Sequence, residues 1–309
     1  MKRLTMFLLL PILVFSACKP EVSVSSPTPA VTEAAPTAID TPIPTDTPTP
    51  TATPTPSGPS LEPQEVTFQA ADGQQLSGLY YPAAVSPAPL VVLMHWVNGN
   101  MSDWYEVAVW LQNRGQANPF PNPGDAPWWD PSWFPPVPAD RSYGVFIFSF
   151  RNCEPNPHGC ANWEPEGWLL DAQAAMLTAS ELEGVDRQKI VAIGSSIGAD
   201  GAVDGCFWLN EQEPGFCQGA LSLSPGDYLG IAYADAVRRL EEEEPVRVAW
   251  CLYGAEDVPS QLTCQSAAGE QYKAYEFPGD AHGNGLLSPG FDPLPMQLIL
   301  DFLEQTIAP

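Results

Sequence analysis

The feature that most constrains the fold is an alternation of short apolar runs with helix-like segments between residues 65 and 305. Continuous apolar runs of this kind are typical of strands buried on both faces, and their alternation with helices favours a mostly parallel sheet. The predicted strands are 65–70, 76–81, 90–94, 145–150, 190–193, 220–223, 246–253 and 272–277, and the predicted helices are 102–113, 166–182, 197–210, 228–243 and 293–305. We therefore expect an α/β fold with helices on both faces of the sheet, and with the first two strands as an antiparallel hairpin at its edge.

One junction in this alternation carries a distinctive motif. The segment 190–202 reads IVAIGSSIGADGA and places Gly194-x-Ser196-x-Gly198 directly after a predicted buried strand and before a predicted helix. In this context G-x-S-x-G predicts a nucleophile elbow, a turn so tight that the neighbours of the central serine must be small. The turn lifts the central hydroxyl to a helix N-terminus, where backbone N–H groups favour developing negative charge. Ser196 is therefore the predicted nucleophile, and Ser195 is a small residue that the turn requires.

A serine hydroxyl needs a base to take its proton, and the base needs an acid to orient it. His282 lies just after the last predicted strand, and it is the histidine that follows Ser196 in the chain, as the order Ser, acid, His demands. Asp257 follows the strand 246–253 and is the predicted acid. Glu256, one position earlier, and Asp227, after the preceding strand, are the alternatives for that role.

The order of elements, the elbow, Asp257 and His282 resemble the α/β-hydrolase fold over about residues 65–308. The phrases SLSPG at 222–226 and DAHG at 280–283 are similar to dienelactone-hydrolase-like and peptidase-like esterases of that fold. The resemblance implies a serine hydrolase that cleaves carboxylic esters of small molecules through an acyl-enzyme. A non-catalytic binding domain that keeps the fold, or a peptidase-like hydrolase, is the alternative.

The same resemblance implies where an oxyanion hole lies. In the family, one donor is the backbone N–H of the residue after the nucleophile, here Ile197, and the other comes from the loop after the third strand. That loop reads HWVNG at 95–99, so Trp96 stands where the family commonly has glycine. A backbone donor survives this substitution, which leaves Val97 or Trp96 as the second donor and gives His95 a structural role.

The N-terminus predicts export. A basic start is followed by an apolar run at 4–15 that is too short to span a bilayer comfortably, and FSAC at 15–18 resembles a bacterial lipobox. Residues 1–17 are thus a predicted lipoprotein signal peptide, and Cys18 is the predicted lipidation site that anchors the protein to the extracytoplasmic face of the cell membrane. An ordinary signal peptide with an incidental cysteine is the alternative.

Two segments are rich in proline and lack any helical or strand period. Residues 18–60 are dominated by Pro, Thr, Ser and Ala, which cannot bury enough apolar area to pack, so we expect a disordered stalk. The folded domain is then 61–309, with a Pro/Trp-rich insertion at about 114–142. This insertion is too long for an ordinary connection, and it forms either one wall of a substrate cleft or a surface flap packed on itself.

Charge and cysteine content narrow the partners further. Lys and Arg number 12 against 37 Asp and Glu, for a net charge of −25, which repels phosphate backbones and excludes nucleic acid as a partner. Beyond Cys18 the chain has an even number of cysteines, which in an exported protein predicts disulfides. The sequence leaves the connectivity open. We expect cysteines that are near neighbours in the sequence to pair: Cys153 with Cys160, Cys206 with Cys217, and Cys251 with Cys264. The spacing does not favour a zinc site, and no metal or organic cofactor is implied.

Overall fold

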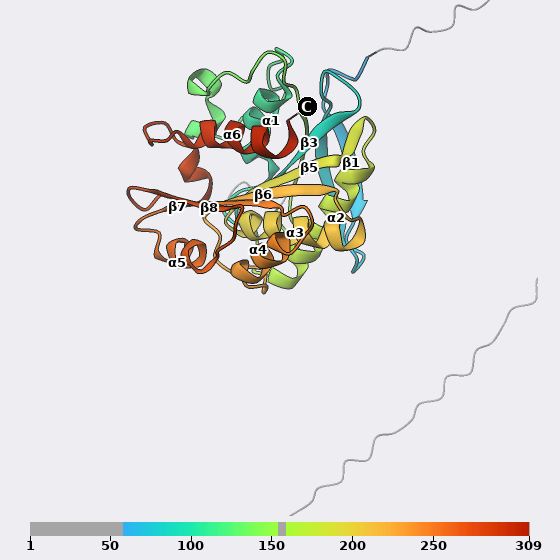
Figure 1. Cartoon of the computed structure of the whole chain (residues 1–309). Helices are drawn as coiled ribbons and strands as arrows, with labels where there is room; N and C mark the ends of the chain where they lie inside the picture. Colours follow the sequence, from blue (N-terminus) through green and yellow to red (C-terminus); the bar gives the residue numbers. More distant parts are fainter. Residues whose placement is uncertain (1–57, 154–158, 309) are drawn as a thin grey trace, which may run out of the picture. The chain divides into compact units, whose positions relative to one another are not determined.

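The computed structural model describes residues 58–153 and 159–308. The predicted signal peptide, the lipidation at Cys18 and nearly all of the stalk lie outside the described residues. The described chain forms an eight-stranded sheet in the order β1-β2-β4-β3-β5-β6-β7-β8 (Figure 1). The strands are β1 (Gln64–Gln69), β2 (Gln75–Tyr81), β3 (Ala88–Met94), β4 (Gly144–Phe148), β5 (Val185–Ser195), β6 (Cys217–Leu223), β7 (Val248–Gly254) and β8 (Tyr272–Phe277).

The sheet is parallel from β4 through β3 to β8, as the apolar runs predicted. β2 pairs antiparallel with both β1 and β4, so the first hairpin is the antiparallel edge that the sequence indicated. Because parallel strands all end at the same edge of a sheet, the loops after β3, β5, β6, β7 and β8 gather at one end of the domain.

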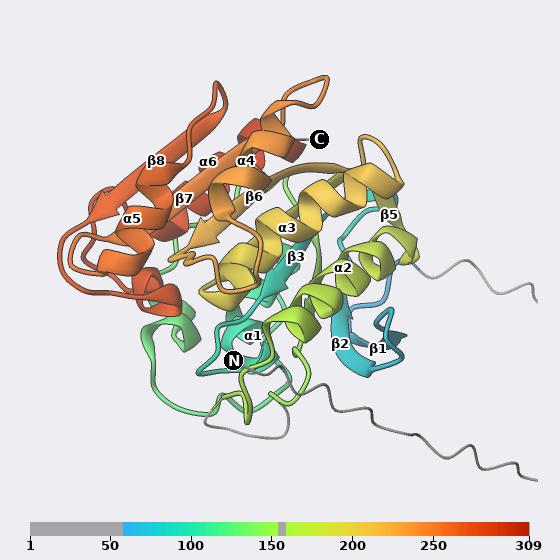
Figure 2. The same cartoon turned by 90° about the horizontal axis from the view of Figure 1, so that it is seen from below.

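Helices cover both faces of the sheet (Figures 1 and 2). Two of them, α1 (Tyr105–Gln112) and α6 (Pro295–Ile307), lie on one face. The other face carries α2 (Pro165–Glu181), α3 (Ile197–Gln212), α4 (Tyr233–Glu241) and α5 (Val258–Ser266).

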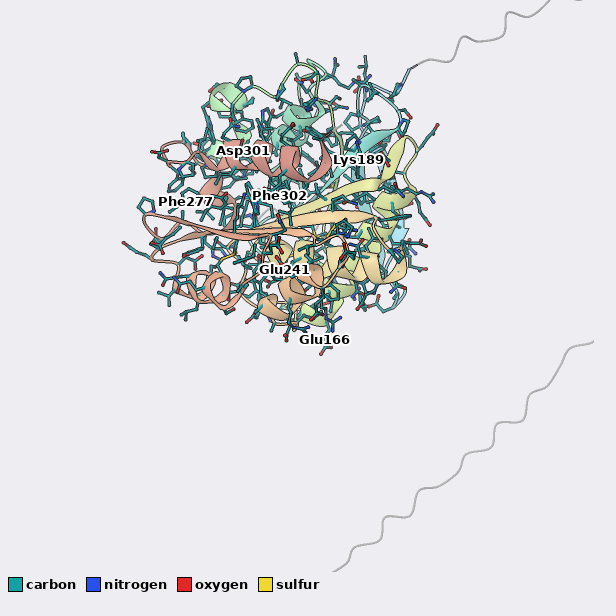
Figure 3. All side chains as sticks on the ribbon, viewed as in Figure 1. Glu166, Lys189, Glu241, Phe277, Asp301 and Phe302 are labelled. Atoms are coloured by element: carbon teal, nitrogen blue, oxygen red, sulfur yellow. A yellow bond between two sulfur atoms is a disulfide. The ribbon has the colours of Figure 1, made fainter. Side chains whose placement is uncertain are left out.

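The core is correspondingly split into two apolar layers. Alternate side chains of a strand enter opposite layers, so Val92 packs with α2 and α3 whereas Val91 packs with α1 and α6. On α6, Phe302 is buried against Trp250 of β7, while its neighbour Asp301 is exposed to solvent (Figure 3). Full burial of both faces explains why the central strands read as unbroken apolar runs.

The structure differs from the sequence-based expectation at several places, among them the start of β5, which lies five residues before the expected one. The helix expected over 228–243 begins only at Tyr233, because residues 224–232 form a loop in which Ser224 and Asp227 have positive φ. α5 was not predicted, since its sequence VPSQLTCQS has no helical apolar period. The insertion contains two short 3-10 turns, η2 (Pro127–Trp129) and η3 (Pro131–Trp133), each begun by a proline.

The cysteines pair between sequence neighbours, as Cys153–Cys160, Cys206–Cys217 and Cys251–Cys264. These bonds are consistent with a protein outside the cytoplasm. Within residues 58–153 and 159–308, none of the helices is both long enough and apolar enough to cross a membrane.

Candidate active site

The elbow lies where β5 runs directly into α3. Ser196 links the two elements with a φ of 53°, a conformation that a non-glycine residue rarely adopts. A Cβ added to Gly194 would lie 1.8 Å from the carbonyl oxygen of Gly198, and one added to Gly198 would lie 2.4 Å from the carbonyl oxygen of Met94. Both positions therefore require glycine, which is the steric reason for the motif.

The structure brings Ser196, His282 and Asp257 together although they come from three different strand ends. His282 Nε2 lies 2.9 Å from Ser196 Oγ, and His282 Nδ1 lies 2.7 Å from Asp257 Oδ2. The Asp257 side chain is only 8% exposed and the His282 side chain is 32% exposed. A carboxylate accepts the Nδ1–H, which leaves Nε2 free to accept the serine proton. This arrangement is able to perform nucleophilic chemistry at Ser196.

The two alternative acids lie elsewhere. Glu256 is exposed to solvent. Asp227 has a different task, because its Oδ1 accepts a hydrogen bond of 2.6 Å from the backbone N–H of Tyr233 and so holds the start of α4. Asp257 is thus the acidic residue that the fold presents to His282.

The two predicted oxyanion donors flank the elbow. Ile197 is the first residue of α3, so its N–H has no partner inside the helix. On the other side, buried His95 accepts the N–H of Phe150 at Nε2 and lies 2.7 Å from the Trp96 carbonyl at Nδ1. That carbonyl therefore faces His95, and in a trans peptide the N–H of Val97 points the opposite way.

His95 is held in a single tautomer by these two contacts. Burial lowers its pKa to about 4, so the ring is neutral, donates from Nδ1 and accepts at Nε2. This arrangement matches the structural role that the resemblance implied.

No family model matches the chain. Among curated proteins it is similar to the uncharacterized protein YfhR of Escherichia coli K12, at 25% identity over 147 residues that span 46% of this chain and 40% of that protein. The same protein of E. coli O157:H7 is 26% identical over 141 residues, which span 44% of this chain and 38% of the relative. The chain thus covers well under half of the length of these curated relatives.

Solved structures resemble this chain over most of its length. The alpha/beta hydrolase GrgF of Penicillium sp. sh18 matches with a TM-score of 0.53 and 13% identity, over 80% of this chain and 99% of that one. A dienelactone hydrolase of Anabaena variabilis has a TM-score of 0.51 and 13% identity, with coverages of 80% and 99%. The esterase Pf2001 of Pyrococcus furiosus has a TM-score of 0.51 and 15% identity, with coverages of 80% and 92%. The chain has the α/β-hydrolase fold.

Aromatic side chains form one wall of the site in this α/β-hydrolase fold. Trp96 lies beside the histidine loop, since a Cβ added to Gly283 would be 3.0 Å from its ring. The rings of Trp96 and Trp128 meet edge to face at 5.8 Å, and both indole N–H groups donate to Asp103, at 2.8 and 3.4 Å. Burial raises the pKa of Asp103 to about 6, while the two indoles lower it. One buried carboxylate thus fastens the insertion to the loop after β3.

The insertion lies against the segment that follows His282. Its first turn, η2, lies against η4 (Gly283–Leu287), the turn that follows His282. Figure 2 shows this green segment beside the red segment after β8. Elsewhere in the insertion, Phe134 packs on its neighbour Trp133 and on Trp110 of α1.

The opposite wall contains a residue that the sequence did not indicate. Tyr228, in the loop after β6, is half-buried, and burial raises the pKa of its hydroxyl. Its ring meets Trp163 edge to face at 6.0 Å, and its backbone N–H donates to the buried carboxylate of Asp200 in α3. No motif or period marks such a loop tyrosine, so the fold alone reveals it.

Metal ligands have no comparable grouping. In the part of the chain that the structure describes, His, Cys, Asp and Glu side chains form no cluster of three or more that could hold a metal ion. The site residues reported above are all side chains and backbone groups of the protein itself.

Proposed function

We propose that this protein is a serine hydrolase that cleaves carboxylic esters of small molecules through an acyl-enzyme intermediate. The observation that carries the proposal is the continuous chain of contacts from Ser196 Oγ through His282 to Asp257, at 2.9 and 2.7 Å. Such distances are those of a nucleophile and its base before reaction. The names of two structural neighbours, an esterase and a dienelactone hydrolase, support an ester as the substrate class.

The proposed reaction follows from this geometry. Ser196 Oγ attacks the ester carbonyl while His282 Nε2 takes its proton, and Asp257 stabilises the imidazolium that forms. The N–H groups of Ile197 and Val97 hold the oxyanion. The intermediate then expels the alcohol, which receives the proton from His282. A water molecule attacks the acyl-enzyme through the same steps, with His282 taking its proton and then returning it to Ser196 Oγ.

We also propose that the protein acts outside the cytoplasm, held at the cell membrane by a lipid on Cys18. The three disulfides support an oxidising compartment. The lipobox-like sequence and the Pro/Thr-rich segment support an anchor followed by a spacer, which at about 3.1 Å per residue would reach on the order of 100 Å.

Intact-mass analysis after treatment with a fluorophosphonate tests the catalytic proposal. We expect one adduct on the parent protein and none on the Ser196→Ala variant, because a fluorophosphonate reacts with an activated serine. Ser195→Ala is the matched control and should still be labelled. A folded parent that takes up no adduct would contradict the proposal and favour a binding domain that keeps the fold.

Membrane fractionation of cells that express the full chain tests the anchor. The parent should be recovered with membranes, and a Cys18→Ser variant should be released from them. Recovery of both proteins in the same fraction would contradict lipidation at Cys18.

A further inference from the structure

The loop after β3 carries Val97, whose backbone N–H is the second donor of the proposed oxyanion hole. Two peptide planes meet at the Cα of this residue: one contains the Trp96 carbonyl and the Val97 N–H, and the other contains the Val97 carbonyl. A backbone donor stabilises an oxyanion best when its N–H already points at the developing charge. Both planes must therefore be held before the ester arrives.

Contacts within the loop and with its histidine hold the first plane. The Trp96 carbonyl lies 2.7 Å from His95 Nδ1 and accepts the Gly99 N–H at 3.1 Å. His95 in turn accepts the N–H of Phe150 at Nε2, at 3.0 Å. Phe150 follows β4, so the loop after β4 supports the first plane through the imidazole.

A second segment, residues 159–160, holds the other plane. Cys160 donates its backbone N–H to the Val97 carbonyl at 2.8 Å. Gly159 is buried, has a φ of 104° and lies against the same peptide, because a Cβ added to it would be 2.3 Å from the Val97 carbonyl oxygen and 2.7 Å from Asn98 Cα. So close an approach of two backbones requires glycine at 159. The peptide after Val97 is thus packed and hydrogen-bonded from outside its own loop.

The disulfide Cys153–Cys160 ties this segment to a firmly held part of the fold. Cys153 is fully buried and donates its backbone N–H to the Phe150 carbonyl at 3.2 Å. Two positions earlier, Arg151 donates from both its backbone and its guanidinium to the buried carboxylate of Asp171 in α2. Cys160 is therefore joined by a covalent bond to a turn that is fixed on β4 and α2.

We propose, on the basis of the proposed ester hydrolysis, that the disulfide Cys153–Cys160 positions the Val97 N–H for the oxyanion. The bond holds Cys160 against the Val97 carbonyl, and the two peptide planes share the Val97 Cα. Release of Cys160 from its buried partner lets the second plane shift, and the N–H of the first plane then changes direction. The role of the disulfide is positioning, since the group that meets the oxyanion is the backbone of Val97.

The test compares Cys153→Ala/Cys160→Ala with the parent on a 4-nitrophenyl ester and on the thionoester of the same acyl group and alcohol, in which sulfur replaces the carbonyl oxygen. Sulfur is a weak hydrogen-bond acceptor, so the thionoester gains little from the oxyanion hole. We expect kcat/KM to fall about tenfold to a hundredfold on the ester and less than about threefold on the thionoester. A general distortion around Ser196 or His282 would slow both substrates alike, so equal losses, or no loss on the ester, would overturn the proposal.

Cys206→Ala/Cys217→Ala is the matched control, because it removes a disulfide at the end of the sheet opposite to Ser196. Its cysteines are 11 positions apart, against 7 for Cys153 and Cys160. The control should keep both values of kcat/KM when all proteins are assayed well below their Tm. The same selective loss in the control would contradict a specific role of Cys153–Cys160.

Gly159→Ala provides an independent variant, because it leaves the disulfide in the chain. The new Cβ would collide with the Val97 carbonyl oxygen, so the variant should reproduce the selective loss on the ester. Gly290→Ala is its control, because Gly290 has a similar φ of 101° and, among the described residues, no atom lies within 4 Å of an added Cβ. This control should keep both values of kcat/KM. Equal losses on the ester and the thionoester in Gly159→Ala would count against the proposal.

Fluorophosphonate labelling separates this proposal from the one on which it rests. An unlabelled parent contradicts the ester hydrolase itself. A labelled parent whose Cys153→Ala/Cys160→Ala variant keeps the same ratio of kcat/KM between ester and thionoester contradicts only the role of the disulfide.

Discussion

The disulfide Cys251–Cys264 closes the segment that carries Asp257, and its removal tests how that carboxylate is held. Cys251 lies in β7 and Cys264 in α5, while Asp257 lies between them at the N-terminus of α5. A shift of this helix start would lengthen the contact of 2.7 Å between Asp257 and His282. The perturbation is the double substitution Cys251→Ala/Cys264→Ala.

The expected loss of stability follows from the length of the closed loop. The two cysteines are 13 positions apart, and closing a loop of that length in the unfolded chain is worth about 3 kcal/mol. For a domain of this size the loss corresponds to a fall in Tm of about 6–12 °C. Well below the lowered Tm, we expect kcat to fall about tenfold, because small displacements of a catalytic group are costly.

The disulfide Cys206–Cys217 supplies a matched control. Its cysteines are 11 positions apart, so the stability loss should agree with the first within a few tenths of a kcal/mol. It joins α3 to the first residue of β6, at the end of the sheet opposite to Ser196. Cys206→Ala/Cys217→Ala should therefore lose stability and keep its kcat.

Thermal unfolding followed by circular dichroism gives the two stability losses, and initial rates on one ester at a temperature where both variants are folded give kcat. Similar kcat values for the two double variants would refute the claim that the first disulfide positions Asp257. Stability losses that differ by more than about 1.5 kcal/mol would refute the account from loop length.

Three further substitutions have outcomes that the structure predicts. Asp204→Asn should leave the free energy of unfolding nearly unchanged near about pH 4 and raise it by about 1–3 kcal/mol near about pH 7. Burial raises the pKa of Asp204 well above its ordinary value, and its buried oxygens have no hydrogen-bond partner within the described part of the chain. The parent therefore loses stability as pH rises above the ordinary pKa of Asp, because the unfolded chain gives up this proton while the folded state keeps it; equal effects at both pH values, measured by urea denaturation, would contradict this. Gly283→Ala should lower kcat at least about tenfold with little change in Tm. Gly283 has a φ of 54° and the new Cβ would lie 3.0 Å from Trp96, so the substitution should displace the loop that carries His282. An unchanged rate of fluorophosphonate labelling would contradict this prediction. Arg151→Met should lower the free energy of unfolding, measured by urea denaturation, by about 3–5 kcal/mol, because it leaves buried Asp171 without its cation. Adding Asp171→Leu should recover most of this loss; a double variant as unstable as Arg151→Met would show that the ion pair is not the cause.

The sequence predicted most of the framework because its signals are local. All eight strands were expected, with β5 beginning five residues before its expected start. Burial on both faces makes β3, β4 and β7 unbroken apolar runs, whereas the edge strands β1 and β8 are partly exposed. The elbow was equally readable, because the clashes that a Cβ would make at Gly194 and Gly198 exclude other residues there. The chain order of nucleophile, acid and base then led to Asp257 and His282, which the structure brings together with Ser196.

The remaining features depend on contacts between distant segments. α5 has too few apolar residues to show a period, and it is tied to β7 by the disulfide Cys251–Cys264. Asp103 reads as an ordinary first-turn carboxylate until the fold brings two indoles to it. Tyr228 lies in the stretch expected to be helical, and its position depends on Asp200, 28 residues earlier in the chain. Loop residues of this kind follow no period, so their partners are set by the three-dimensional arrangement alone.

Convergence at one edge of the sheet explains why the sequence alone, although it missed several features of the fold, still located Ser196, Asp257 and His282. Ser196 and His282 are 86 residues apart and Asp257 and His282 are 25 apart, yet each lies just beyond the carboxyl end of its own strand. The register of β5, β7 and β8 therefore brings the three loops that carry these side chains to the same edge of the sheet. Errors in the expected start of α4 or in the insertion do not move these strand ends. Tyr228 and Trp96, in contrast, lie in loops, and their positions depend on side-chain contacts that no pattern in the chain encodes.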